Sequence, residues 1–213
     1  PLKQPNLPDE TIRAITKDTK GKIWLGYYTR GLYYYSDKSH FFEKFKIDQA
    51  GTNPDWDRIR SLFTSSDGTI WAGTYKGILR ISNNKYTAYE NSDISGISIA
   101  RCYSMIEDQN KQIWMGGWGG LAKFNLLSGK FESFKGQELL NKFHIRCVRK
   151  NNKDLILATE NSGVIVFNLN TGIIKKISTK EGILGNSVYS VLIDNQSDNY
   201  SITTSISSLV VAL

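Results

Sequence analysis

Four arginines recur at one position of a repeated sequence pattern, each directly after the apolar residue that opens its segment. They are Arg13, Arg60, Arg101 and Arg146. A guanidinium is planar and always charged, and it can hold a carboxylate or sulfate through two parallel hydrogen bonds. If the opening strands are the innermost strands of a radial fold, these side chains would converge and favour a carboxylated or sulfated ligand. The alternative is that each arginine pairs with a carboxylate of a neighbouring repeat.

A second group of candidate binding residues lies in loops that follow a strand containing tryptophan and glycine. They are Tyr27, Tyr28 and Arg30 in the first segment, Tyr75 and Lys76 in the second, and Trp118 in the third. Aromatic and basic groups together suit a sugar. Four glycines flank Trp118 and would let a ligand approach closely, although loop packing is the alternative. The insertion 55–58 could contribute to binding or be an ordinary exposed loop.

Five tandem repeats must position these residues. A strand with the pattern Ile-Trp-x-Gly is centred on Trp24, Trp71 and Trp114, and degenerate versions are centred on Ile156 and Ser201. The spacing of these centres falls in the range of about 40–50 residues that is typical of propeller blades. The approximate units are 10–48, 57–92, 98–136, 143–179 and 186–213. Each unit reads as four short strands separated by turn residues, so the sequence predicts an all-β fold, a β-propeller of four-stranded blades.

The number of units leaves the closure of the ring open. Five units could close as a five-bladed propeller, but the fifth unit ends soon after Val210 and Val211. We therefore expect about five repeats of a larger propeller. Within the second unit the predicted strands are 59–64, 69–74, 77–82 and 85–89.

The repeated tryptophans are predicted to pack between blades, because each lies in mid-strand beside isoleucine at the same register. The residue after each arginine is always small, which predicts a crowded column; these residues are Ala14, Ser61, Cys102, Cys147 and, in the fifth unit, Ser190. Both cysteines of the chain lie in this column and are explained by their size. A disulfide between Cys102 and Cys147 is the alternative.

Charge and composition favour some functions and disfavour others. The chain has 213 residues, a net charge of +7 and 12% aromatic residues. The basic residues are spread along the chain without a basic stripe, so we do not expect nucleic-acid binding. His40 and His144 are isolated and no metal-ligand spacing or nucleophile–base motif occurs, so we expect no metal, no cofactor and no catalytic activity in this segment. No stretch is apolar enough to span a membrane.

The second unit resembles the two-component regulator propeller repeat most closely. The matching residues run from Asp67-Gly68-Thr69-Ile70-Trp71-Ala72-Gly73-Thr74 to Gly77-Ile78-Leu79, and Ile113-Trp114-Met115-Gly116 with Gly120-Leu121 is nearly as similar. The resemblance implies a fragment of a seven-bladed propeller in the periplasmic sensor region of an inner-membrane histidine kinase. It also implies that the ligand is an oligosaccharide or another small molecule, often a product of carbohydrate breakdown.

The partners implied by this resemblance are Ig-like and kinase segments further along the same protein, with a homodimer as one option. Ligand binding on one propeller face would shift kinase signalling by favouring one of two states. Two alternatives stay open at this point. One is a non-catalytic propeller scaffold in an envelope or secretion assembly, and the other is a propeller-type polysaccharide lyase or glycosidase.

Overall fold

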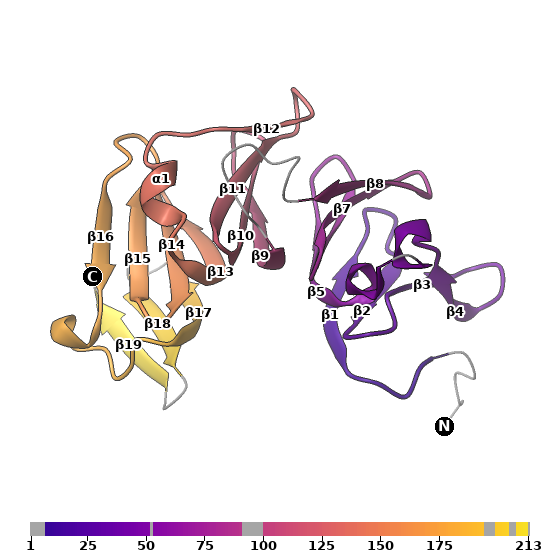
Figure 1. Cartoon of the computed structure of the whole chain (residues 1–213), viewed down its shortest axis with the longest axis horizontal. Helices are drawn as coiled ribbons and strands as arrows, with labels where there is room; N and C mark the ends of the chain where they lie inside the picture. Colours follow the sequence, from indigo (N-terminus) through magenta and orange to yellow (C-terminus); the bar gives the residue numbers. More distant parts are fainter. Residues whose placement is uncertain (1–6, 52, 91–99, 194–198, 205–207, 213) are drawn as a thin grey trace. The chain divides into compact units, whose positions relative to one another are not determined.

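The chain folds almost entirely into antiparallel sheets (Figure 1). The computed structural model describes residues 7–51, 53–90, 100–193, 199–204 and 208–212. These residues form two compact units, of which the first contains residues 7–90 with Ala100–Cys102 and the second contains residues 103–212. The prediction of an all-β fold with four-stranded blades is confirmed. The repeat ends that we predicted at residues 92, 98 and 213 lie outside the described residues.

The first unit contains two four-stranded sheets. One is formed by β1 (Ile12–Lys17), β2 (Ile23–Tyr27), β3 (Leu32–Ser36) and β4 (Phe41–Phe45), and the other by β5 (Ile59–Thr64), β6 (Ile70–Thr74), β7 (Gly77–Ser82) and β8 (Lys85–Glu90). The 3-10 helices η1 (Asp48–Gly51) and η2 (Pro54–Asp57) connect them. The strands of the second sheet match the predicted ranges to within one residue, because turn-forming residues mark each strand end.

The second unit contains the remaining sheets. Strands β9 (Ala100–Glu107), β10 (Gln112–Trp118), β11 (Gly120–Asn125) and β12 (Lys130–Glu132) form one sheet, and the first three residues of β9 belong to the first unit. Helix α1 (Gln137–Leu140) precedes the sheet of β13 (His144–Asn151), β14 (Asp154–Glu160), β15 (Gly163–Asn168) and β16 (Ile174–Ile177). The 3-10 helix η4 (Thr179–Glu181) leads to a three-stranded sheet of β17 (Val188–Ile193), β18 (Asn199–Thr204) and β19 (Ser208–Ala212).

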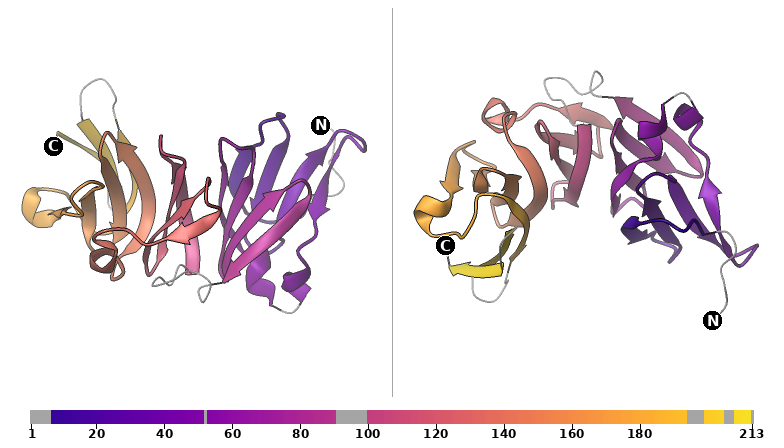
Figure 2. Two further views of the ribbon diagram at one scale, coloured as in Figure 1. Left: turned by 90° about the horizontal axis from the view of Figure 1, so that it is seen from above. Right: turned by 60° about the horizontal axis from the view of Figure 1, so that its bottom comes forward.

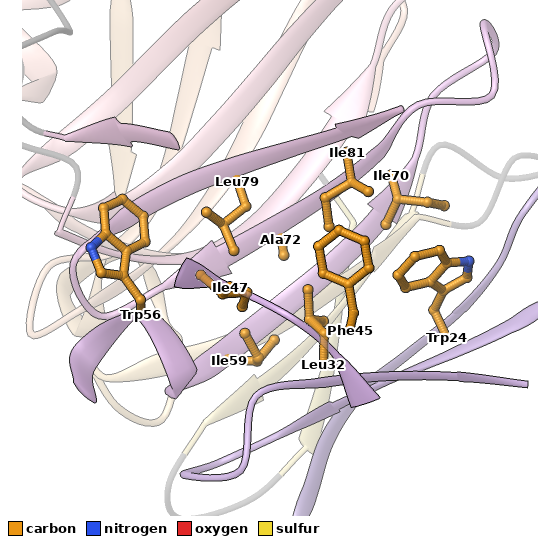
Figure 3. Close-up of a cluster of buried hydrophobic side chains, with 10 residues drawn as sticks. All are labelled: Trp24, Leu32, Phe45, Ile47, Trp56, Ile59, Ile70, Ala72, Leu79 and Ile81. Atoms are coloured by element: carbon orange, nitrogen blue, oxygen red, sulfur yellow. The ribbon is translucent and has the colours of Figure 1, made fainter. Parts of the chain in front are cut away.

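The two sheets of the first unit lie side by side (Figure 2), and apolar side chains from both form one core between them (Figure 3). Trp24 of β2 packs there with Phe45 of the same sheet and with Ile59 and Ile70 of the next. Trp114 packs in the second unit with residues of the following sheet, among them Val148. The predicted burial of the repeated tryptophans is confirmed, since Trp24, Trp71 and Trp114 are all at most 4% exposed.

The glycine of each Trp-x-Gly pattern lies where the opening strand of the next sheet crosses the second strand. A methyl group added to Gly26 would lie 2.5 Å from Cγ2 of Ile59, and one added to Gly116 would lie 2.5 Å from Cγ2 of Ile145. Two non-bonded carbon atoms cannot approach this closely, so only glycine permits the two strands to pack at this distance. The repeat pattern therefore encodes contact between neighbouring sheets.

The insertion 55–58 is not an ordinary exposed loop. It forms η2, and Trp56 is 2% exposed and belongs to the core between the first two sheets. Asn53 begins η2 by accepting a hydrogen bond from the N–H of Asp55 (2.9 Å). Trp56 thus extends the core at the insertion, and its burial removes a large apolar area from water.

Cys102 and Cys147 are both free and buried, as the small-residue column predicts. The hydroxyl of Ser61, in the same column, donates to the carbonyl of Cys102 (2.8 Å). The turns before the second strands have positive φ at Gly21, Gly68 and Asn152, a conformation that glycine and asparagine tolerate. In the third repeat Lys111 has the positive φ, at 59°.

The turn before Trp71 depends on the carboxylate of Asp67. Its Oδ1 accepts hydrogen bonds from the hydroxyl of Ser65 (2.6 Å) and the N–H of Thr69 (3.0 Å). The Oγ of Ser65 in turn accepts a hydrogen bond from the indole of Trp71 (3.0 Å). Partial burial raises the pKa of Asp67, but these hydrogen bonds and the nearby charge of Arg80 outweigh burial and hold the pKa below its ordinary value.

We expect the variant Asp67→Asn to lose less stability in acid than the parent protein. Because the folded pKa of Asp67 lies below the unfolded value of about 3.9, its ionised form stabilises the protein above that pH. This contribution is lost as the pH falls through the folded pKa, and asparagine cannot titrate. Urea unfolding at a series of pH values from about 6 to about 2 measures the difference. An unchanged pH dependence in the variant would contradict this assignment.

Candidate functional site

The arginine of each opening strand lies at an irregularity of the β-ladder. The pairing register shifts between Ile12 and Ala14, between Ile59 and Ser61, and between Ile145 and Cys147. The residue inside each shift is an arginine, and Arg101 has a φ of 57° in the corresponding position of β9. A bulged residue leaves the regular alternation of the strand and its side chain is re-aimed. The backbone therefore directs these arginines toward the loops between the second and third strands.

A repeated backbone hydrogen bond places a tyrosine beside two of these arginines. The N–H of Tyr28 donates to the carbonyl of Thr11 (3.1 Å), and the N–H of Tyr75 donates to the carbonyl of Arg58 (3.1 Å). In both cases the acceptor lies two residues before the bulged arginine. The two tyrosine rings lie 6.1 Å apart, and their hydroxyl oxygens are separated by 3.3 Å.

Four guanidiniums surround these two rings in the first unit, and we call this set the arginine–tyrosine cluster. It consists of Arg13, Tyr28, Arg58, Arg60, Tyr75 and Arg101. The Cζ of Arg60 lies 4.4 Å from the ring centroid of Tyr75 and 5.0 Å from that of Tyr28, and its Nη2 donates to the Tyr75 hydroxyl. Such cation–π contacts stabilise closely spaced positive charges.

Arg13 and Arg101 each lie over a different tyrosine of the cluster. Arg13 lies over Tyr28 at 5.1 Å, whereas Arg101 lies over Tyr75 at 4.7 Å. Arg58 contacts both rings and also pairs with Asp55 at 3.2 Å, where both side chains are about 40% exposed. The cluster thus combines four positive charges with one exposed carboxylate, which favours an anionic ligand.

The other predicted residues of the first unit have different surroundings. Arg30 pairs with Glu10 (3.3 Å) and Lys76 pairs with Glu90 (3.1 Å), both at exposed positions. Tyr27 was also predicted as a binding residue, but its side chain is buried in the structure. Tyr27 is 1% exposed and packs edge-to-face on Tyr33, because the last residue of β2 points into the core while the next residue points out.

In the second unit the equivalent arginine forms an ion pair. The Nη2 of Arg146 lies 2.7 Å from Oε2 of Glu160, and its Cζ lies 4.4 Å from the ring centroid of Tyr103. The sequence suggested, as an alternative to ligand binding, that each arginine pairs with a carboxylate of a neighbouring repeat. Arg146 does pair with a carboxylate, but Glu160 belongs to its own sheet. The charge of Arg146 is therefore compensated by Glu160.

Trp118 lies at the tip of the β10–β11 hairpin and is 38% exposed. Its ring stacks on His144, the first residue of β13, with centroids 3.9 Å apart and planes 28° apart. One face of the indole is thus occupied by a histidine. The remaining exposed surface is an aromatic patch of the kind that sugars bind.

Tyr103 and His144 contact candidate residues but were not predicted as site residues, whereas Arg58 belongs to the insertion that was considered as a possible contributor. The burial of Tyr27 could have been inferred from the other repeats. The residues aligned with it are small, namely Thr74, Gly117 and Thr159. Thr74 and Thr159 both donate their hydroxyls to the carbonyl of the glycine that opens the third strand (2.9 and 2.7 Å). The next aligned position holds Tyr28, Tyr75, Trp118 and Glu160. Tyr28, Tyr75 and Glu160 contact arginines, and Trp118 stacks on His144.

Within the described ranges, no group of three or more histidine, cysteine, aspartate or glutamate side chains could hold a metal ion. The same part of the chain has no helix with the length and apolarity that crossing a bilayer requires.

Family comparison agrees with the resemblance found in the sequence. Residues 6–29 match the family model described as two component regulator propeller. These residues are therefore similar to one two-component regulator propeller repeat. The matched residues belong to the first repeat, although the sequence pattern is most complete in the second repeat, at residues 67–79. A comparison with curated proteins finds no match.

Solved structures show the same fold over nearly the whole chain. The extracellular domain of BT4673 from B. thetaiotaomicron superposes with a TM-score of 0.75 at 20% identity, covering 96% of this chain and 28% of that one. It is described once as a candidate one component system and once as a candidate hybrid two component system. PorZ, a surface component of the type-IX secretion system of Porphyromonas gingivalis, gives 0.74 at 17% identity, covering 97% of this chain and 32% of that one.

An enzyme shares the fold as well. Virginiamycin B lyase from Staphylococcus aureus gives a TM-score of 0.71 at 14% identity, covering 96% of this chain and 67% of that one. At these identities the likeness shows the β-propeller fold alone. The propeller repeats described here span about a third or less of the length of BT4673 and PorZ.

Proposed function

We propose that this chain is part of the extracytoplasmic, ligand-sensing propeller of a two-component regulatory protein and that it has no catalytic role. The observation that carries the proposal is the arginine–tyrosine cluster, where the guanidiniums of Arg13, Arg58, Arg60 and Arg101 lie over two tyrosine rings. The ligand is an acidic oligosaccharide released by carbohydrate breakdown. The match of residues 6–29 to the regulator propeller family supports the sensor role.

The cluster suits a carboxylated or sulfated sugar for two reasons. A guanidinium presents five N–H donors in a planar fork, which can hold a carboxylate or sulfate through two parallel hydrogen bonds. An anionic ligand also relieves the mutual repulsion of the four positive charges, so binding gains from both effects. Tyr28 and Tyr75 offer hydroxyls for the neutral parts of the same sugar.

Signalling requires that the ligand bind two states of the protein unequally. In this proposal the acidic sugar favours one arrangement of the bulged opening strands, and the change reaches Ig-like and histidine-kinase segments further along the protein. The whole protein would lie in the inner membrane with this part in the periplasm, and it could act as a homodimer.

Isothermal titration with a uronic-acid trisaccharide and with its uncharged methyl ester tests the ligand class. We expect the acid to bind and the ester to bind at least tenfold more weakly, because esterification removes the charge that the guanidiniums recognise. Binding of the acid should weaken at high salt. Equal binding of acid and ester, or binding of neither, would contradict the proposed ligand.

The second candidate function is a scaffold in an envelope or secretion assembly, which the fold shared with PorZ favours. Phosphorylation of the full-length protein upon addition of the acidic trisaccharide supports the sensor. A full-length protein without a kinase, or association with secretion components independent of any sugar, supports the scaffold. Release of products from a polysaccharide would favour an enzyme.

A further inference from the structure

A hollow of about 400 Å³ lies in the first unit at the end of the strands opposite to the arginine–tyrosine cluster. In the β1–β2 pair, Ile12 lies across from Tyr27 at the cluster end, and Lys17 lies across from Ile23 at the other end. The hollow is formed there by the β1–β2, β5–β6 and β7–β8 turns. We call it the turn-end hollow. Its volume falls in the range of small-molecule sites, about 300–1,000 Å³.

Trp24 lines this hollow and carries a buried hydrogen-bond donor. The side chain is 4% exposed and lines the hollow, and its Nε1 has no hydrogen-bond partner within the described residues. Figure 3 shows this nitrogen on the side of the ring that is turned away from the other nine side chains. A buried polar group without a partner costs free energy, so an acceptor from a ligand would be favoured there.

The equivalent tryptophans show that this donor is an exception in the repeat. The Nε1 of Trp114 donates to Oδ2 of Asp108 (2.9 Å), six residues earlier in the chain. The Nε1 of Trp71 donates to Ser65, also six residues earlier. The first repeat has Asp18 at this position, and its Oδ1 accepts hydrogen bonds from the N–H groups of Lys20 (2.9 Å) and Lys22 (2.8 Å).

The rest of the lining suits hydroxyl groups and has balanced charge. The carboxylates of Asp18 and Asp67 both line the hollow, together with Lys20 and Lys22. Each carboxylate uses Oδ1 for its own turn and retains capacity as an acceptor, because an ionised carboxylate can accept about four hydrogen bonds. The amide of Asn84 adds a donor and an acceptor, and the same residue lines an adjoining hollow of about 660 Å³.

We propose that the turn-end hollow binds an uncharged sugar. One hydroxyl oxygen of the sugar accepts the hydrogen bond of Trp24 Nε1, and other hydroxyls donate to the carboxylates of Asp18 and Asp67. The two carboxylates and two lysines of the lining leave no excess positive charge to attract an anionic sugar, whereas the arginine–tyrosine cluster contains four guanidiniums, so the two sites select different ligands. The proposal does not depend on the proposed function of the cluster.

The test uses the full chain labelled with ¹⁵N at the tryptophan indoles, titrated with galactobiose, cellobiose and, separately, galacturonic acid. The Trp24→Phe variant identifies the indole resonance of Trp24. We expect a neutral disaccharide to shift this resonance in a saturable manner, and galacturonic acid to leave it in place. Saturating the cluster with the acidic trisaccharide should not prevent the shift, which separates the two sites.

Two variants and a control extend the test. Trp24→Phe keeps the aromatic packing but removes the donor, and Asn84→Gly removes the amide while tolerating the positive φ of that turn position (58°). Each should weaken binding of the neutral disaccharide roughly tenfold. The control is Asn152→Gly, at a similar φ (49°) in the second unit, which should bind as the parent does. An unmoved Trp24 resonance with all neutral probes, or unchanged binding in Asn84→Gly, would overturn the proposal and leave water as the occupant.

Discussion

Replacing Gly73 by alanine is expected to lower the free energy of unfolding by about 3 kcal/mol, the upper end of the usual cost of overpacking. A methyl group at this position of β6 would lie 2.5 Å from Oγ of Ser61 and 2.8 Å from Cβ of Cys102, and it would also meet the carbonyl oxygen of Cys102. Because one of these atoms belongs to the backbone, no side-chain rotation can relieve the clash. Urea unfolding monitored by tryptophan fluorescence measures the loss.

The matched control for this prediction is Gly51→Ala. A methyl group at Gly51, in the 3-10 helix η1, has no atom within 4 Å. This variant should change the free energy of unfolding by no more than about 0.5 kcal/mol, as is usual for exposed positions. Similar losses in the two variants would show that strand crossing does not explain the glycine of the Trp-x-Gly pattern.

Arg60→Ala is expected to weaken binding of the acidic trisaccharide by roughly ten- to a hundredfold. Arg60 lies over both tyrosine rings and is central to the cluster, and a hydrogen bond to a charged group contributes about 1.5–3 kcal/mol. Arg60→Lys keeps the charge but loses the planar fork, so its affinity should lie between those of the parent and Arg60→Ala. Isothermal titration at low salt measures all three proteins.

The control for this prediction is Arg149→Ala, which removes the same charge from β13 in the second unit. The Nη1 of Arg149 donates to the carbonyl of Val148 (2.9 Å), and the residue is not part of the cluster. It should bind the acidic trisaccharide as the parent does once its folding has been verified by thermal unfolding. Equal losses in Arg60→Ala and Arg149→Ala would indicate a response to net charge and would contradict a specific site.

The sequence shows less about the candidate site than about the fold, and Tyr27 and Tyr28 illustrate why. Tyr27 is the last residue of β2 and Tyr28 follows it directly, yet the first is buried and the second lies in the cluster. Adjacent residues of a strand point to opposite faces, so a change of one residue in register reverses the assignment. The aligned residues Thr74 and Thr159 contain this information, because a small residue at that position indicates an inward-facing side chain.

Trp56 and Arg146 show a second limit of the sequence. The charged neighbours of Trp56 suggest an exposed loop, but the core between the first two sheets buries its side chain. Arg146 occupies the same register as Arg60, but it pairs with Glu160 where the second repeat has Tyr75. In both cases the outcome depends on side chains that are distant in sequence, which no local pattern specifies.

The sequence by itself determined the repeat, the four-stranded sheets and the burial of Trp24, Trp71 and Trp114. These features follow from short-range regularities: apolar alternation, turn residues and a glycine at each strand crossing. Only the tertiary structure decided that Arg13, Arg60 and Arg101 gather around Tyr28 and Tyr75, and that the indole N–H of Trp24 has no hydrogen-bond partner among the residues that the structure describes. The physical reason is that bulges re-aim side chains and that packing between sheets sets their neighbours.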